Sequence, residues 1–309
     1  MIKEPYNHPF LGYEALAAML IQRGMRGDKE IILQRIEDVG YQRLQAYWGT
    51  DSQGLIHVHI DDVWTQYCFD RQIRLALLDA IERIEVAVRN RLVHCYCEEY
   101  GPFGYLEPVN FGKTDVESWE RWVSKLHKSA RNSSLLSIRK FFDKYSNDDL
   151  PLWLACELMD FGSTVFFYSH VKLAIQKKVS RSLGLPSPIV LASWLRALND
   201  VRNACAHHNR VWNRTWAKMP ALPANSVDWY AAYDVKSREW RASDGKIGSF
   251  AIAKTGVILT ICRYLLRQVA SSSMWHERLM ALFSNPRFSG LPHQWMGLPY
   301  GWENHPLWR

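Results

Sequence analysis

The sequence predicts an all-α protein, and three observations lead to this prediction. Apolar residues recur at three- and four-residue spacing through most of the chain, as expected for amphipathic helices. Gly and Pro stand mostly at the ends of these periodic segments, where helices stop. Internal repeats and low-complexity tracts are absent from the sequence. The alternating stretch Ile56–Ile60, by contrast, predicts a loop or a short hairpin strand.

The first predicted helices are short and are bounded by glycines. Residues 13–23 have apolar side chains at helical spacing, and Gly24 supplies a stop. Asp28 has a carboxylate suited to cap the next helix, which ends near Gly40. Residues 41–48 then predict a third short helix.

The clearest helical pattern covers residues 63–100. Glu85 and Arg89 lie four residues apart in the order that favours an ion pair on a helix. Gly101 and Pro102 end this segment firmly. Its predicted buried stripe consists of Leu75, Leu78, Ile81, Ile84, Val88 and Leu92.

The helical pattern continues through the second half of the chain. Further helices are expected over residues 118–131, 135–145, 151 to a break at 162–163, 165–182, 189–208, 247–270 and 274–283. Residues 284–309 are rich in Pro, Gly and Trp, and predict an extended, packed tail. We therefore expect an N-terminal helical segment (1–62), a central core (63–220), and a C-terminal helical segment with the tail (221–309).

Composition favours an anionic partner. The 309 residues carry a formal net charge of +7, and the pI is about 9.0. No apolar run is long enough to span a bilayer, and the start of the chain lacks the apolar core of a signal peptide. We therefore expect no membrane partner and a cytoplasmic location. The six cysteines lack zinc-site spacing, which predicts free thiols in a reducing compartment.

The segment 202–214 concentrates the reactive side chains. Eight of its thirteen residues are Arg, His or Asn. Arg is a permanent cation that can hold a phosphate, and His exchanges protons near neutral pH. RNA cleavage without a metal needs a base for the ribose 2′-OH, a cation for the phosphoryl charge and an acid for the leaving oxygen. The segment therefore predicts an enzyme that acts on RNA.

Within this segment, Arg202 and His207 are the predicted catalytic pair. They lie five residues apart, about 1.4 helical turns, so they flank one phosphate only if the helix end loosens or a second copy contributes. Asn203 and His208 are possible supporting residues. Arg210, Asn213 and Arg214 are predicted RNA contacts, with a solvated surface role left open, whereas Trp212 is expected to pack rather than stack on a base.

The spacing of Arg and His alone is weak evidence. Arg121 and His127 match it, and so do Arg89 and His94, where Asn90 also follows the Arg. The Arg89 match is expected to be structural because Val88 and Leu92 place that helix in the core. Glu82, Glu85 and Glu157 are likewise expected to form ordinary salt bridges.

The wider pattern is more specific, because it resembles the Abi-like (abortive infection) proteins, the AbiD/AbiF group of bacterial phage defence. The resemblance rests on Trp194-Leu195, Arg202-Asn203, Cys205-Ala206-His207-His208, Arg210 and Trp212-Asn213-Arg214. Further matching segments are Arg23-Gly24-Met25, Gly40 to Leu44, Asp79 to Glu85 with Arg89-Asn90, Pro151 to Gly162, and Met296 to Trp308.

The resemblance implies a HEPN-type helical bundle, with an N-terminal helical extension and a C-terminal helix and tail. Proteins of this superfamily that cleave RNA carry an Arg-X4–6-His motif, usually act as homodimers with a composite site, and use no metal or other cofactor. By that match Arg202 and His207 are catalytic, and a small noncoding RNA is a further partner. The RNA substrate is expected to be single-stranded, because in-line attack needs a flexible backbone. Asn209 stands where nucleotidylated toxins of the superfamily carry Tyr, so that control is not expected.

Two functions of other classes remain open from the sequence. One is an RNA-binding protein that holds a noncoding RNA with little or no turnover. The other is a protein-interaction scaffold, which the positive net charge makes less attractive.

Overall fold

The protein is built almost entirely from helices. The computed structural model describes residues 9–112, 115–221, 233–234, 239–241, 247–249, 253–298 and 301–309, and these contain twelve α-helices. The predicted all-α class is therefore confirmed. Within the described residues, no helix is both long enough and apolar enough to cross a membrane.

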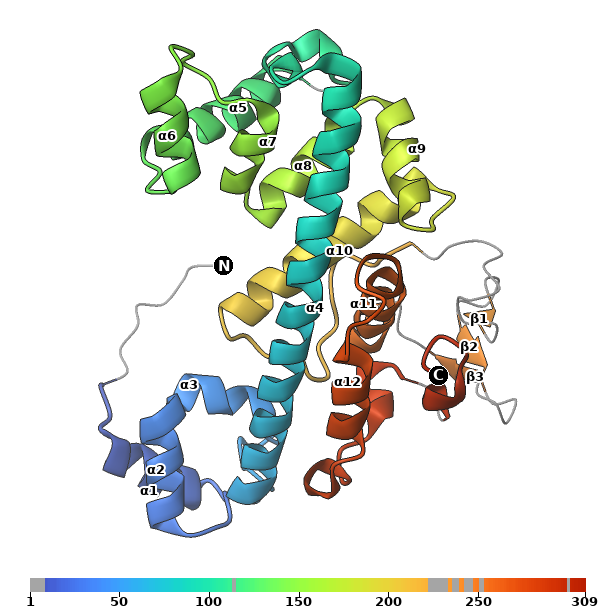
Figure 1. Ribbon diagram of the computed structural model, residues 1–309. Coiled ribbons are helices and arrows are strands. Elements are labelled where there is room, and N and C mark those ends of the chain that lie inside the picture. The colour runs from blue at the N-terminus through green and yellow to red at the C-terminus, as the bar shows by residue number, and fades with distance from the viewer. Residues whose placement is uncertain are drawn as a thin grey trace.

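The helix α4 (Ile60–Tyr100) forms the axis of the molecule (Figure 1). Its 41 residues extend for about 60 Å at 1.5 Å per residue. The predicted buried stripe is wrong at Leu75, which is 48% exposed, and Leu78 is only partly buried. The stripe instead follows residues that share one face of the helix, namely Ile73, Leu77, Ile81, Ile84, Val88 and Leu92.

Three short helices pack near the start of α4. They are α1 (Tyr13–Gln22), α2 (Lys29–Val39) and α3 (Tyr41–Leu44). The predicted cap is present, since the Asp28 carboxylate accepts from the backbone N–H groups of Glu30 and Ile31. Gly24 has a φ of 98°, and a Cβ there would lie 2.5 Å from the carbonyl oxygen of Ile56, so the turn requires glycine.

Five helices form the other end of the molecule. The predicted break at residues 162–163 is wrong, because the Asp160 carboxylate accepts from the N–H of Ser163 and caps a helix that includes both residues. The break falls instead at Met159 and Asp160, and a further break at Val171 and Lys172 divides the predicted helix 165–182. The helices are α5 (Val116–Arg131), α6 (Leu136–Lys144), α7 (Leu152–Ala155), α8 (Phe161–His170) and α9 (Leu173–Ser182).

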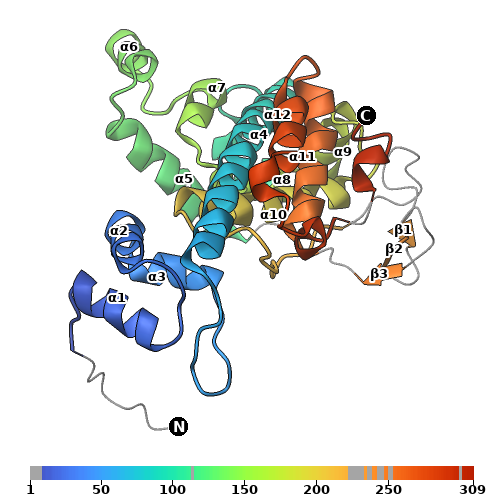
Figure 2. The same cartoon turned by 90° about the horizontal axis from the view of Figure 1, so that it is seen from below.

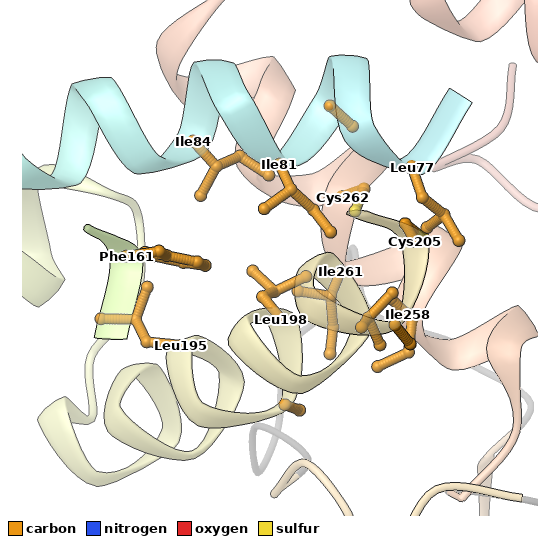
Figure 3. Packing of buried hydrophobic residues seen from close by; sticks show 14 of the residues in the cluster. Leu77, Ile81, Ile84, Phe161, Leu195, Leu198, Cys205, Ile258, Ile261 and Cys262 are labelled. Atoms are coloured by element: carbon orange, nitrogen blue, oxygen red, sulfur yellow. The ribbon is translucent and has the colours of Figure 1, made fainter. Parts of the chain in front are cut away.

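The core lies where α10 (Pro188–Ala206) and α11 (Thr255–Val269) pack against α4. Figure 3 shows Leu77, Ile81 and Ile84 of α4 directed toward Leu195 and Leu198 of α10 and Ile258 and Ile261 of α11. All these side chains are fully buried. The start of α11 differs from the predicted helix 247–270, because Ile247–Ser249 forms a strand and the helix begins at Thr255.

A small antiparallel sheet, not predicted from the sequence, precedes α11. Its strand order is β1-β2-β3, with Tyr233 opposite Trp240 and Trp240 opposite Gly248. The strands are β1 (Tyr233–Asp234), β2 (Glu239–Arg241) and β3 (Ile247–Ser249).

The C-terminal tail follows α12 (Trp275–Phe283) and is packed, as predicted. Leu307 and Trp308 are buried, and Trp302 packs edge-on against Trp308. Short 3-10 turns replace fully extended chain in the tail and punctuate the other loops. They cover Gln45–Tyr47, Gly104–Leu106, Pro108–Asn110, Cys156–Leu158, Pro286–Phe288, His293–Met296 and Trp302–Asn304.

The elements divide into two sides of α4. In Figures 1 and 2, α1–α3 and α5–α6 lie on one side, whereas α11, α12 and the sheet lie on the other. The helix α10 crosses α4, and its C-terminal end is directed to the side of α1–α3 (Figure 1). The segment 202–214, which concentrates the Arg, His and Asn side chains, therefore begins at a helix end on the side of α1–α3.

Candidate functional site

The site is built on the C-terminal end of α10. The helix ends at Ala206, and the backbone N–H groups of His208 and Asn209 turn back onto it. The N–H of His208 donates to the carbonyl of Cys205 at 3.0 Å, and the N–H of Asn209 donates to Ala204 at 2.8 Å. This pair of bonds is the Schellman motif, which reverses the chain sharply. His208 has a φ of 58°, the left-handed conformation that this motif requires.

The turn presents the predicted catalytic residues at the surface. His207 and His208 are exposed, Asn203 is exposed, and Arg202 is half-buried. The Arg202 Nη1 donates to the Asn203 Oδ1 at 3.4 Å. Within the described part of the chain, no hydrogen bond joins Arg202 to His207. One chain thus carries the Arg202 guanidinium and the two imidazoles at the same helix end, but Arg202 and His207 do not form a hydrogen bond there.

Arg202 faces charged residues of α4. Burial raises the pKa of the Glu85 carboxyl, and the positive charges of Arg89 and Arg202 oppose this rise. The Arg89 guanidinium lies 3.7 Å from Glu85 and donates to the carbonyl of Met159 at 2.8 Å. Arg89 therefore has the structural role predicted for it, and it forms the predicted ion pair with Glu85. His94, which follows Arg89 at the same spacing as His207 follows Arg202, is exposed on α4.

A buried acidic residue holds the chain that follows the turn. The Asp70 carboxylate of α4 accepts from the N–H of Val211 at 3.0 Å and from the N–H of Trp212. It also accepts from the Tyr47 hydroxyl and forms an ion pair with Arg74. Burial raises the pKa of Asp70, and these hydrogen bonds and the Arg74 charge oppose the rise.

A second set of contacts fixes the segment against α11. The Thr255 hydroxyl donates to the carbonyl of Val211 at 2.7 Å, and the Lys254 ammonium donates to the Asn213 side chain at 3.2 Å. Asn213 has a φ of 52°. Trp212 is buried and packs edge-on against Phe69, so its predicted packing role is confirmed.

The predicted RNA contacts after the turn have partners inside the protein. The Arg210 guanidinium donates to the carbonyl of Ala46, which joins the turn to the N-terminal helices. The Arg214 guanidinium lies 4.4 Å from the centre of the Trp216 ring. Together with Asn213, these residues brace the segment, and each arginine remains partly exposed.

Comparison with known proteins places this site within a recognised family. The family model described as Abi-like protein matches residues 34–213, more than half of the chain. The chain belongs to the Abi-like family. The matched region of this Abi-like protein starts in α2 and ends at Asn213, so it includes α4, α10 and the whole turn. No curated protein and no solved structure matches the chain.

Asp70 and Tyr47 are site-forming residues of this Abi-like protein that the sequence reasoning missed. The sequence did contain a signal for Asp70. Asp70 and Arg74 have the four-residue spacing of a helical ion pair, and they stand among the apolar residues Phe69, Ile73 and Leu77 on the buried face of one helix. A charged pair on an apolar face needs buried partners, and here those partners are backbone N–H groups from residues 211 and 212.

The six cysteines are all free thiols, as predicted. Cys205, inside the Arg-to-His segment of the Abi-like protein, is buried, and this burial raises its pKa to about 12. It therefore stays a protonated thiol at neutral pH and fills the core beside α11. Among the described residues, no three His, Cys, Asp or Glu side chains gather as metal ligands.

Proposed function

We propose that this Abi-like protein is an endoribonuclease of the HEPN type that serves in abortive-infection defence against phage. The observation that carries the proposal is the end of α10, where Arg202 and an exposed His207 lie on a turn braced from two sides. A phosphate contact and a proton carrier on rigid backbone suit a reaction that depends on positioning.

In the proposed reaction, the nucleophile belongs to the RNA. A histidine removes the proton from a ribose 2′-OH, and the 2′-oxygen attacks the adjacent phosphorus. Arg202 holds the phosphoryl oxygens and stabilises their extra negative charge. The bond from phosphorus to the 5′-oxygen breaks, and an acid protonates that oxygen. The products are a 2′,3′-cyclic phosphate and a 5′-hydroxyl end, and the steps use no metal.

The proposal includes a homodimer with a composite site. Two proton transfers are needed, and within one chain His207 makes no hydrogen bond to Arg202 in the described structure. The exposed end of α10 leaves both residues accessible to a second copy. In this arrangement, His207 of one subunit acts as the base or the acid, and the second group comes from the partner subunit.

The proposed substrate is single-stranded RNA, because in-line attack needs a flexible backbone. The net charge of +7 supports an RNA partner, including a bound small noncoding RNA. Asn203 and His208 support the catalytic pair, and Arg210, Asn213 and Arg214 lie near the strand. The alternative function is RNA binding without turnover.

The test compares wild-type protein with Arg202→Ala and His207→Ala on labelled single-stranded RNA in the presence of EDTA. Each variant should cleave at least about 100-fold more slowly, because each loses a charge-stabilising or proton-transferring group. Mass spectrometry should find 2′,3′-cyclic phosphate ends in the wild-type products. His94→Ala and Arg121→Ala, which alter exposed residues of the look-alike spacings, serve as matched controls.

The catalytic assignment fails if both motif variants cleave as fast as wild type. RNA that copurifies with the protein and stays uncut under all conditions would favour the binding function instead.

A further inference from the structure

A groove of 1210 Å³ adjoins the turn at the end of α10. One wall consists of His208, Asn209 and Arg210, and the opposite walls come from α1, α2 and the segment 40–47. The groove thus shares a wall with the site proposed to cut RNA. A strand bound at that site must place its neighbouring nucleotides against nearby surface.

The walls of the groove are fixed by contacts within the protein. Arg210 donates to the carbonyl of Ala46, which ties the turn to the opposite wall. The Arg23 guanidinium donates to the carbonyl of Gly54 through Nε at 3.0 Å and Nη2 at 2.9 Å. Tyr47 is held by the buried Asp70. The groove is therefore preformed and needs no rearrangement to receive a ligand.

The lining combines apolar surface with positive charge. Leu16, Met19 and Tyr41 supply apolar surface, and Gln42, Gln45 and Asn209 supply amide groups. Arg23, Arg43 and Arg210 are the charged side chains of the lining, and no carboxylate is among its described residues. This distinguishes it from the smaller groove of 1010 Å³ beside α6, which includes Asp143, Asp148 and Asp149.

An exposed aromatic side chain stands at the edge of this groove. Phe10 is 95% exposed and lies among the lining residues. Exposed aromatic rings next to cationic surface are typical of single-stranded nucleic-acid sites, where bases stack on the rings and arginines attract the backbone.

We propose that this groove is the subsite for the nucleotide next to the scissile phosphate of a single-stranded RNA. A nucleobase has apolar faces and a polar edge, which match the apolar walls and the amide groups. The linking phosphate is an anion, which matches a lining with three arginines and no carboxylate. The proposal rests on the proposed ribonuclease function for the identity of the strand, and it assigns Gln42, Gln45 and Phe10 to base contact.

The first experiment adds one carboxylate to the groove. The His207→Ala protein, with and without Gln42→Glu, is titrated into a short fluorescein-labelled single-stranded RNA, and anisotropy is measured. Gln42→Glu should weaken binding about tenfold, since it loses a base contact and repels the phosphate. Gln34→Glu makes the same chemical change on the exposed part of α2 outside the groove and should leave binding unchanged.

The second experiment removes the aromatic ring. Phe10→Ala should weaken binding of the same RNA about tenfold through the loss of stacking. Tyr145→Ala removes a different exposed aromatic ring, on the chain after α6, and should have no effect. An RNA with 4-thiouridine should cross-link to residues 40–47. Thermal unfolding followed by circular dichroism verifies that every variant is folded.

The outcomes separate this inference from the ribonuclease proposal. If wild type fails to cleave RNA but Gln42→Glu and Phe10→Ala still weaken binding, the groove assignment stands and the cleavage proposal fails. If wild type cleaves, and the two groove substitutions change neither RNA binding by the His207→Ala protein nor the cleavage rate and base preference of the protein with His207, the groove assignment is wrong. Cross-links confined to residues outside the groove would also overturn it.

Discussion

His208 combines a strained backbone conformation with an exposed imidazole. The left-handed conformation after a helix is normally occupied by glycine, because a Cβ raises its energy by about 1–2 kcal/mol. The protein nevertheless has an imidazole there, exposed and next to His207. Strained residues of this kind gather at functional sites, where the surrounding structure holds them. The imidazole of His208 can therefore be removed by substitution with glycine without loss of the backbone conformation that the turn requires.

We predict that His208→Gly separates these roles. Removing the Cβ relieves the left-handed conformation, so the free energy of unfolding measured with urea should rise by about 1 kcal/mol. RNA cleavage should fall at the same time, because the groove wall loses its imidazole. Gly290→Ala, in open surroundings of the tail, is a control that should change neither quantity by much. A less stable His208→Gly protein would contradict the strain argument.

The long helix α4 organises both the core and the site. Its face with Ile81 and Ile84 packs against α10 and α11, and Asp70, nearer its start, binds the backbone that follows the turn. An element of the hydrophobic core therefore also sets the position of the reactive segment. This dual role makes the buried Asp70 more consequential than the exposed carboxylates on the same helix.

We predict that Asp70→Ala lowers the free energy of unfolding by about 3 kcal/mol, since it leaves Arg74 and two N–H groups without their buried partner. The RNA cleavage rate should also decrease. Asp79→Ala removes a carboxylate of the same helix that pairs with Arg83 and Arg278 near the surface, and should cost less than about 1 kcal/mol. Equal losses for the two variants in urea unfolding would show that burial of Asp70 has no special effect.

Most helices could be predicted from the sequence, and the misses have physical reasons. Apolar spacing located α4 and α10 because their buried faces are long, whereas Gly162 suggested a break that the Asp160 cap overrides. The strand at Ile247–Ser249 was missed because, in the sequence, Ile247, Phe250 and Ile252 extend the apolar pattern of α11 backward without a clear stop. Arg202 and His207 could be found from their residue types and their spacing in the sequence. Their bracing by Asp70 and Thr255 could not, because it joins segments far apart in the sequence.

At the scale of the whole molecule, stability depends on two partly buried histidines, His276 of α12 and His293 of the C-terminal tail. Burial lowers the pKa of His293 and, with the charge of Arg263, that of His276. The His293 Nδ1 accepts from the Trp302 indole at 3.3 Å, which requires this nitrogen to carry no proton. Protonation therefore opposes the packing of the tail against α12.

We predict that the protein loses stability as pH falls below the ordinary histidine pKa of about 6.5. Below a pH of about 6.5, the histidines of the unfolded chain bind protons more readily than those of the folded chain. The stability that the neutral histidines contribute is therefore complete above this pH and declines as the pH falls toward their lowered pKa in the folded protein. Urea unfolding at about pH 7.5 and about pH 5.5 measures this loss. His293→Gln should reduce the pH dependence and the exposed His94→Gln should not, and identical behaviour of both would contradict the assignment.

The packing of α4 also determines when the fold can be completed during synthesis. Its apolar stripe is covered by α11, which ends about 170 residues after α4. At ~5–20 residues per second, the ribosome needs on the order of ten to thirty seconds to add them. Lys254 and Thr255, which hold Asn213 and Val211, emerge late in the same interval. A nascent chain that already contains Arg202 and His207 thus lacks the contacts of Lys254 and Thr255 with the segment after the turn, and we expect a chain that ends before them to cleave no RNA.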